Sequence, residues 1–136
     1  MTHRGAVSIR VLVIDDQRTM RDIIRHLLGQ VGIHDVEEAE NGEEAVDLIC
    51  RPGFVQPDII ICDLHMKKMD GMEFCNKMRL DKNILQPGIP IIILTGNHDT
   101  FMHEVTQQIG ATTVLLKPVS ADALKEQIEA AVGFSI

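Results

Sequence analysis

Four short apolar runs, each followed at once by a polar residue, constrain the fold of this chain more than any other feature. The runs cover residues 9–14, 58–62, 90–94 and 113–116 and are rich in isoleucine, leucine and valine. Apolar runs of this length bounded by turn residues are typical of fully buried strands. We therefore predict four such strands, and a weaker one at 36–39 whose acidic residues indicate a position at or near a sheet edge.

Helical patterns alternate with the predicted strands along the whole chain. Apolar residues at helical spacing predict helices at about 20–31, 43–49, 70–82, 100–109 and 121–132. Asp70 is expected to cap the third of these helices. Strands that alternate with helices over short connections form parallel sheets with right-handed crossovers and helices on both faces. The predicted fold class is therefore α/β, a doubly wound (βα)₅ domain with a five-stranded parallel sheet.

Length and composition fit one domain and exclude several classes of partner. The chain has 136 residues, 45% of them hydrophobic, without a linker or internal repeat, so we predict a single domain over 1–136 with its core at about 9–133. A net charge of −7 without a basic block, and the absence of Trp and Tyr, argue against direct nucleic-acid binding. No signal peptide or membrane-spanning run is visible, so no membrane contact is expected. Three cysteines without C-x-x-C spacing indicate a reducing compartment, and we expect a cytoplasmic protein.

The polar residues that follow the runs predict a site. Asp15 and Asp16 follow the first run, Asp63 the second, Thr95 the third and Lys117 the fourth. In an open parallel sheet, ligands bind outside the carboxyl ends of the strands. Each residue alone has an ordinary explanation, such as a helix cap or a solvated strand end. Their joint placement on one rim indicates a phosphoryl-transfer site.

The residue types at this rim suit a metal-assisted phosphoryl transfer. Three converging carboxylates cannot all stay ionised in a partly buried site unless a cation such as Mg²⁺ joins them. A carboxylate can also act as a nucleophile and form an aspartyl phosphate, and Asp63 ends the central buried strand. Lys117 and the hydroxyl of Thr95 are placed to bind phosphoryl oxygens.

Several segments resemble the motifs of one known family over nearly the whole chain. The matching segments are VIDD at 13–16, AENG at 39–42, DIIICD at 58–63, Met66 with MDG at 69–71, LTG at 94–96 and LKP at 116–118. Together they resemble the receiver domains of response regulators, the CheY-like family. The resemblance implies a flavodoxin-like strand order of 2-1-3-4-5.

The resemblance also implies roles for the site residues. Asp63 would accept a phosphoryl group from a histidine of a sensor kinase or a histidine phosphotransfer protein. Asp16, Asp63 and the backbone carbonyl of His65 would ligate Mg²⁺ directly, and Asp15 would act mainly through a metal-bound water. Thr95 and Lys117 would bind the phosphoryl oxygens.

Signalling in this family implies a binding module rather than an enzyme, apart from Mg²⁺-dependent self-phosphorylation and self-dephosphorylation. The output would be a changed contact with a downstream protein at the face of the fourth helix, fifth strand and fifth helix. The resemblance further implies a cis peptide between Lys117 and Pro118, in keeping with the rule that cis bonds precede proline.

The chain departs from the family pattern at a few positions. Val114 stands where the family often has an aromatic residue that turns inward on phosphorylation, so we expect the signal to pass through loop shifts around Thr95. Lys67 replaces a common proline, and with Lys68 it is expected to lie in a solvated loop. His65 and Asn97 occupy positions that, in the family, tune the loss of the phosphoryl group.

Other functions remain as alternatives. The chain could be the receiver part of a longer DNA-binding regulator. A small aspartyl-phosphate phosphatase is less favoured, because His65 stands where such enzymes need a second aspartate. A flavodoxin-like electron carrier is disfavoured because Asp15 and Asp16 would repel a cofactor phosphate. Neither common phosphate-loop motif for nucleotides occurs.

Overall fold

A five-stranded parallel sheet forms the centre of the computed structural model, which describes residues 9–136. Its strands are β1 (Arg10–Ile14), β2 (Asp35–Ala39), β3 (Ile59–Asp63), β4 (Ile91–Thr95) and β5 (Thr113–Leu116). They lie in the order β2-β1-β3-β4-β5. The predicted fold class and strand order are therefore confirmed. Residues 1–8, which the predicted domain range includes, lie outside the described residues.

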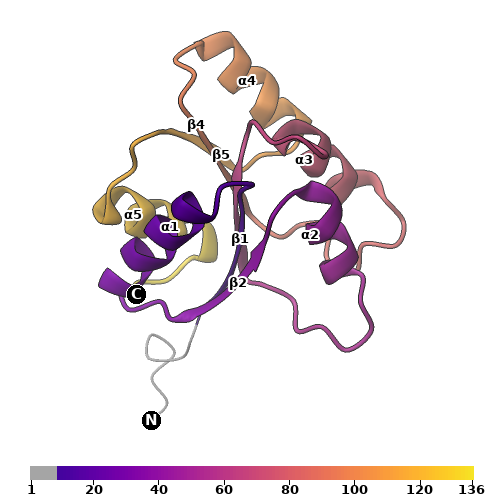
Figure 1. The fold of residues 1–136 in the computed structure, drawn as a ribbon, viewed down its shortest axis with the longest axis horizontal. Coiled ribbons are helices and arrows are strands. Elements are labelled where there is room, and N and C mark those ends of the chain that lie inside the picture. The colour runs from indigo at the N-terminus through magenta and orange to yellow at the C-terminus, as the bar shows by residue number, and fades with distance from the viewer. Residues whose placement is uncertain (1–8) are drawn as a thin grey trace.

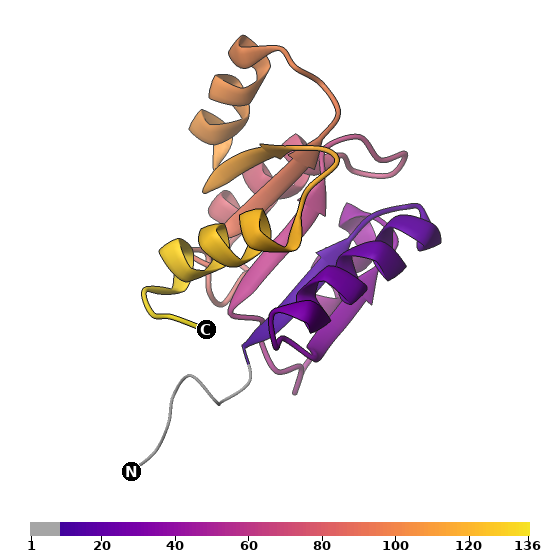
Figure 2. The same ribbon diagram turned by 90° about the vertical axis from the view of Figure 1, so that its left-hand side faces the viewer.

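Helices cover both faces of the sheet. They are α1 (Arg18–Gln30), α2 (Gly42–Ile49), α3 (Gly71–Leu80), α4 (Thr100–Ile109) and α5 (Ala121–Val132). Figures 1 and 2 show α1 and α5 together on one face and α2, α3 and α4 on the other. Within residues 9–136, none of the helices combines the length and apolar character needed to cross a membrane.

The central strands are apolar on both sides because each side packs on a helical layer. In β3, Ile60 and Cys62 belong to the core beneath α2 and α3, whereas Ile59 and Ile61 belong to the core beneath α1 and α5. All four side chains are fully buried. This two-sided burial fixes the register of β3, since a shift by one residue would exchange the two cores.

The two edge strands differ from their central neighbours. β2 lies at one edge, as its acidic residues predicted. β5 lies at the other edge, and the prediction that it is fully buried was wrong. Its residues are half-buried or exposed, and Leu116 keeps 39% of its surface. An edge strand has a neighbour on one side only, which an apolar run does not reveal.

The start and end of α3 illustrate local control by side chains. Asp70 is the N-cap, as predicted, and forms a reciprocal capping box with Glu73. The helix ends at Leu80, two residues before the predicted end. Asp81 adopts an extended backbone there, and its carboxylate binds the Lys77 ammonium and accepts the N–H of Asn83. These contacts stabilise a turn in place of another helical residue.

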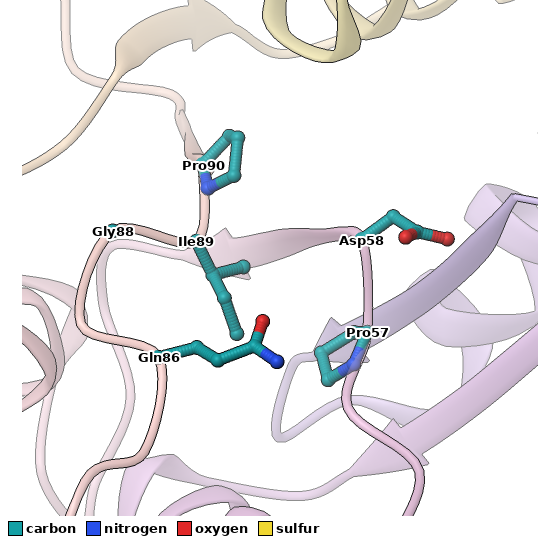
Figure 3. Close-up of a pocket in the computed structure, with 6 residues that line it drawn as sticks. All are labelled: Pro57, Asp58, Gln86, Gly88, Ile89 and Pro90. Carbon is teal, nitrogen blue, oxygen red and sulfur yellow. The ribbon is translucent and has the colours of Figure 1, made fainter.

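A hollow lies at the end of the sheet where β3 and β4 begin (Figure 3). It measures about 310 Å³ and is lined by Pro57, Asp58, Gln86, Gly88, Ile89 and Pro90. The carboxylate of Asp58 accepts the backbone N–H of Arg10 at 2.8 Å. This hollow is at the opposite end of the strands from the predicted polar rim.

Candidate functional site

Three carboxylates meet at the carboxyl ends of β1 and β3. Asp15 and Asp16 directly follow β1, and Asp63 is the last residue of the neighbouring β3. One ligand atom from each residue lies within 4.8 Å of those from the other two. The structure therefore brings together the acidic residues that the sequence analysis placed on one rim.

Lys117 reaches this cluster from the edge strand β5. Its ammonium lies 2.6 Å from Oδ1 of Asp63 and 3.8 Å from Oδ2 of Asp15. Its backbone N–H donates to the carbonyl of Thr95 at 2.8 Å, and the Lys117–Pro118 peptide is cis, as expected. One ammonium thus contacts two of the three carboxylates, and the cluster carries an excess of negative charge.

Asp15 is the most confined member of the cluster, with 1% of its surface exposed. Its Oδ1 accepts the N–H of Gln17 at 2.8 Å, whereas its buried Oδ2 has no hydrogen-bond partner. Burial raises the pKa of Asp15, and the charge of Asp63 adds to the rise, against opposing effects of Gln17 and Lys117. Gln17, and neither aspartate, is the N-cap residue of α1. Helix capping therefore does not explain the aspartate pair.

The donor set of this cluster fits a magnesium ion. Carboxylate oxygens are the hard ligands that Mg²⁺ takes in proteins, and Mg²⁺ commonly keeps waters and is held by one or two carboxylates. Oδ2 of Asp15 is a buried acceptor without a hydrogen bond, and Asp16 is exposed at the mouth. A divalent cation would offset the charge that Lys117 alone leaves unbalanced.

Thr95 lies beside the cluster but does not present an open hydroxyl. It follows Leu94, the residue that pairs with Asp63 across β3 and β4. The residue is fully buried, and its Oγ1 accepts the N–H of Asn97 at 3.0 Å. Oγ1 only accepts in this bond, so its own O–H can still donate. Because the residue is fully buried, a contact between this hydroxyl and a bound phosphoryl group requires a local rearrangement that exposes it.

The loop after Asp63 borders two hollows on either side of Asp16. One, of about 300 Å³, is lined by Asp16, His65, Met66, Lys67 and Asp70. The other, of about 210 Å³, is lined by Asp16, Glu40, Asn41, Lys67 and Lys68. The side chains of His65, Lys67 and Lys68 are exposed, as predicted for the two lysines. Lys67 thus lines both hollows beside Asp16.

Two glycines, one at the start of α2 and one at the start of α3, allow close backbone packing at this loop, and the sequence analysis missed their role. A Cβ atom on Gly71 would lie 2.8 Å from the carbonyl oxygen of Asp63 and 2.9 Å from Cα of Leu64. A Cβ atom on Gly42 would lie 2.7 Å from the carbonyl oxygen of Met69, whose own φ is 54°. The motif letters contained both glycines, but the close approach is visible only in three dimensions.

We predict that Gly71→Ala destabilises the protein, because the added methyl group would meet backbone atoms that cannot move away independently. The expected loss in the free energy of unfolding is about 1–3 kcal/mol. Gly88→Ala is the matched control, since a Cβ atom there has no neighbour within 4 Å. It should change the stability by less than about 0.5 kcal/mol. Urea unfolding measures both, and equal losses would contradict the close-packing explanation.

A second prediction concerns pH and the raised pKa of Asp15. The ordinary pKa of this carboxyl group is 3.8, and the pKa in the folded protein is higher. At pH values between these two pKa values, the folded protein binds more protons than the unfolded chain. The stability of the metal-free protein should therefore fall as the pH rises through this window. Asp15→Asn should remove that fall and stabilise the metal-free protein at neutral pH by about 1 kcal/mol.

Urea unfolding with a chelator present, at a pH near 4 and at neutral pH, tests this prediction. The Asp15→Asn variant should gain stability relative to the unmodified protein only at the higher pH. A variant that is less stable at neutral pH would show that the Asp15 carboxylate is favourable in the folded state.

Arg21 is a third residue that the sequence analysis missed. It shares the buried face of α1 with Ile24 and Leu28, three and seven residues further on. A charged residue at a helix position that the apolar spacing assigns to the core needs a polar partner. This spacing was the sequence signal that could have identified Arg21. Its guanidinium donates to the backbone carbonyl of Asp15 at 2.8 Å.

The positions that depart from the family pattern have ordinary surroundings. Val114 pairs with Ile93 and packs against the core beneath α2 and α3, which fits its interpretation as a strand residue. His98 is exposed. His103 is half-buried, and its Nε2 lies 2.6 Å from the carbonyl oxygen of Asn97.

Comparisons with known proteins agree on one family. The family model described as "Response regulator receiver domain" matches residues 11–129. A Rhizobium etli protein named "Probable chemotaxis protein CheY" is 34% identical over 129 residues, which cover 94% of this chain and 95% of that protein. A chemotaxis protein CheY homolog of Campylobacter jejuni is 34% identical over 125 residues, or 92% of this chain and 93% of the homolog.

The fold has a close counterpart among solved structures. The chemotaxis response regulator CheY4 of Vibrio cholerae superposes with a TM-score of 0.79 at 28% identity. The match covers 92% of this chain and 99% of that chain. The similarity therefore extends over nearly the whole of both proteins.

Proposed function

This chain belongs to the response regulator receiver domain family of two-component signalling, and we propose that Asp63 is its phosphoacceptor. The observation that carries the proposal is the 2.6 Å contact between Oδ1 of Asp63 and the Lys117 ammonium. This contact orients the Asp63 carboxylate at the mouth of the site, where Asp16 is exposed. Receiver domains of this kind are signalling domains, and the predicted absence of a conventional enzyme activity fits this family.

The proposed donor is a phosphorylated histidine of a sensor kinase or a histidine phosphotransfer protein. An oxygen of Asp63 attacks the phosphorus, the P–N bond breaks as the new P–O bond forms, and the histidine leaves with its electron pair and takes up a proton. Lys117 would then bind an oxygen of the transferred group as a point charge. Thr95 would bind another oxygen after a local rearrangement that exposes its hydroxyl, which is buried in this structure.

The same proposal assigns the acidic cluster to Mg²⁺. Asp16, Asp63 and the backbone carbonyl of His65 would bind the ion directly, and Asp15 would act mainly through a bound water. When bound, Mg²⁺ supplies positive charge that offsets the charge of the incoming phosphoryl group. The nearby Asp15 oxygen without a hydrogen bond supports this assignment.

The proposed output is a change in protein–protein contact at the face of α4, β5 and α5. Phe101 and Leu116 are large apolar residues on these elements, with 70% and 39% of their surfaces exposed. We further propose that the domain spans 1–136, with its core at 9–133, and works in the cytoplasm. A receiver within a longer DNA-binding regulator and a small phosphatase remain alternatives, although His65 disfavours the latter.

The proposed function is tested by phosphoryl uptake from acetyl phosphate, measured as intact mass. With Mg²⁺ present, the protein should gain one phosphoryl group, and removal of Mg²⁺ with a chelator should abolish the gain. Equal uptake with and without Mg²⁺ would contradict the metal assignment. No uptake by the folded protein, while a known receiver is labelled in parallel, would contradict the proposed function for small donors.

A further inference from the structure

We propose that Arg21 is a positioning residue that holds the Asp15–Asp16 backbone in the shape that the magnesium site needs. The inference rests on the proposed function, because it concerns the same site. Arg21 has only 8% of its surface exposed, and it lies on α1 rather than among the loops that carry the acidic residues. One of its guanidinium nitrogens donates to the backbone carbonyl of Asp15 at 2.8 Å.

This bond completes a set of backbone and side-chain contacts around Asp15. The N–H of Asp15 donates to the carbonyl of Ala39 at 3.1 Å, and Oδ1 accepts from Gln17 at 2.8 Å. With Arg21 on the carbonyl, three groups of the residue are fixed and Oδ2 is left without a hydrogen bond. The carbonyl of Asp15 belongs to the peptide plane that carries the N–H of Asp16. Fixing this plane therefore orients both aspartates.

Glu38 on β2 supports Arg21 from the other side. The Arg21 Nε donates to the Glu38 carboxylate at 2.9 Å, so the guanidinium is held between Glu38 and Asp15. Arg25 also donates to Glu38, at 2.6 Å. The fork of donors in an arginine lets one side chain reach two acceptors in fixed directions, which a lysine ammonium does less well. Arg21 on α1 and Glu38 on β2 thus fix the position of the backbone that carries Asp15 and Asp16.

The chain contains a matched control for this contact. Arg25 lies one turn further along α1 and makes bonds of the same two kinds, to Glu38 and to the backbone carbonyl of Val36. The two arginines differ in the carbonyl that they bind and in burial, since the side chain of Arg21 is buried and that of Arg25 is exposed. Arg21→Lys and Arg25→Lys both keep the charge and alter contacts to Glu38 and to a backbone carbonyl, but only the first acts on Asp15. The stability of each variant, measured in parallel, accounts for the difference in burial.

The test measures the Mg²⁺ affinity of the folded, unphosphorylated protein by NMR titration with magnesium chloride. Arg21→Lys should weaken Mg²⁺ binding by roughly tenfold, the scale seen when outer partners of metal ligands are lost. Arg25→Lys should change it by less than about twofold, because its carbonyl partner is remote from the site. Thermal unfolding of both metal-free variants, recorded in parallel, reports the purely structural contribution.

The outcomes separate this inference from the proposed function. If both variants lose thermal stability while their Mg²⁺ affinities stay equal to that of the unmodified protein, Arg21 is only structural and the inference is overturned. If both lose affinity equally, the Asp15 carbonyl has no special role and the inference is again overturned. If the unmodified protein itself fails to bind Mg²⁺, the metal assignment fails and the inference falls with it.

Discussion

Asp63→Asn is expected to take up no phosphoryl group from acetyl phosphate and Mg²⁺, whereas Asp58→Asn should be labelled like the unmodified protein. An amide oxygen is a far weaker nucleophile than a carboxylate. The substitution also removes the negative charge that binds the Lys117 ammonium. Asp58 immediately precedes the same strand at its opposite end, and an asparagine there can still accept the Arg10 N–H. Intact mass measures both variants under identical conditions.

The Asp58 control separates the chemistry from the fold. A general disturbance of β3 would lower labelling in both variants, and circular dichroism would report it. Undiminished labelling of Asp63→Asn would show that another residue accepts the phosphoryl group. In that case the contact between Asp63 and Lys117 would be a structural ion pair.

Lys117→Gln is expected to slow phosphoryl uptake by roughly 10²–10³-fold, the scale on which a preorganised group that stabilises transition-state charge contributes. Lys117 is the cation that the described structure places 2.6 Å from Asp63. Lys125→Gln on α5 is the matched control and should leave the rate within about twofold. A time course of intact mass gives the rates.

The Mg²⁺ affinity of Lys117→Gln shows whether slower phosphoryl uptake comes from a lost phosphoryl ligand or from weaker metal binding. Removal of a positive charge beside three carboxylates should leave Mg²⁺ binding unchanged or stronger. Slow labelling with intact or stronger Mg²⁺ binding would therefore place Lys117 on the phosphoryl oxygens. Slow labelling that parallels weaker Mg²⁺ binding would contradict that role, because the variant would then lack the metal rather than a phosphoryl ligand.

The parallel α/β fold and the convergence of the carboxylates could be predicted from the sequence for a physical reason, whereas the strand order was implied by the resemblance to the receiver family. Buried parallel strands need apolar runs, and the first polar residue after each run marks the edge where ligands bind. Asp15, Asp16, Asp63 and Lys117 all lie at such positions, and the structure brings them together. This part of the site follows from the positions of these residues at the ends of predicted strands.

Other features depend on three-dimensional contacts that a linear pattern does not contain. The exposure of β5 follows from its place at the edge of the sheet formed by residues 9–136, and an apolar run looks the same in an edge strand and in a central strand. The burial of Thr95 depends on how the loop at Asn97 folds back. Arg21 is a charged residue within the helical pattern of α1, and only the position of the Asp15 carbonyl reveals its partner.

The most direct test of the central claim is to locate the phosphoryl group after labelling with acetyl phosphate and Mg²⁺. Borohydride converts an aspartyl phosphate into homoserine, and peptide mass spectrometry then identifies the modified residue. We expect homoserine at position 63 and at no other aspartate. Homoserine at position 15 or 16, or a phosphoryl group on any other residue of a labelled protein, would contradict the assignment of Asp63 as the phosphoacceptor.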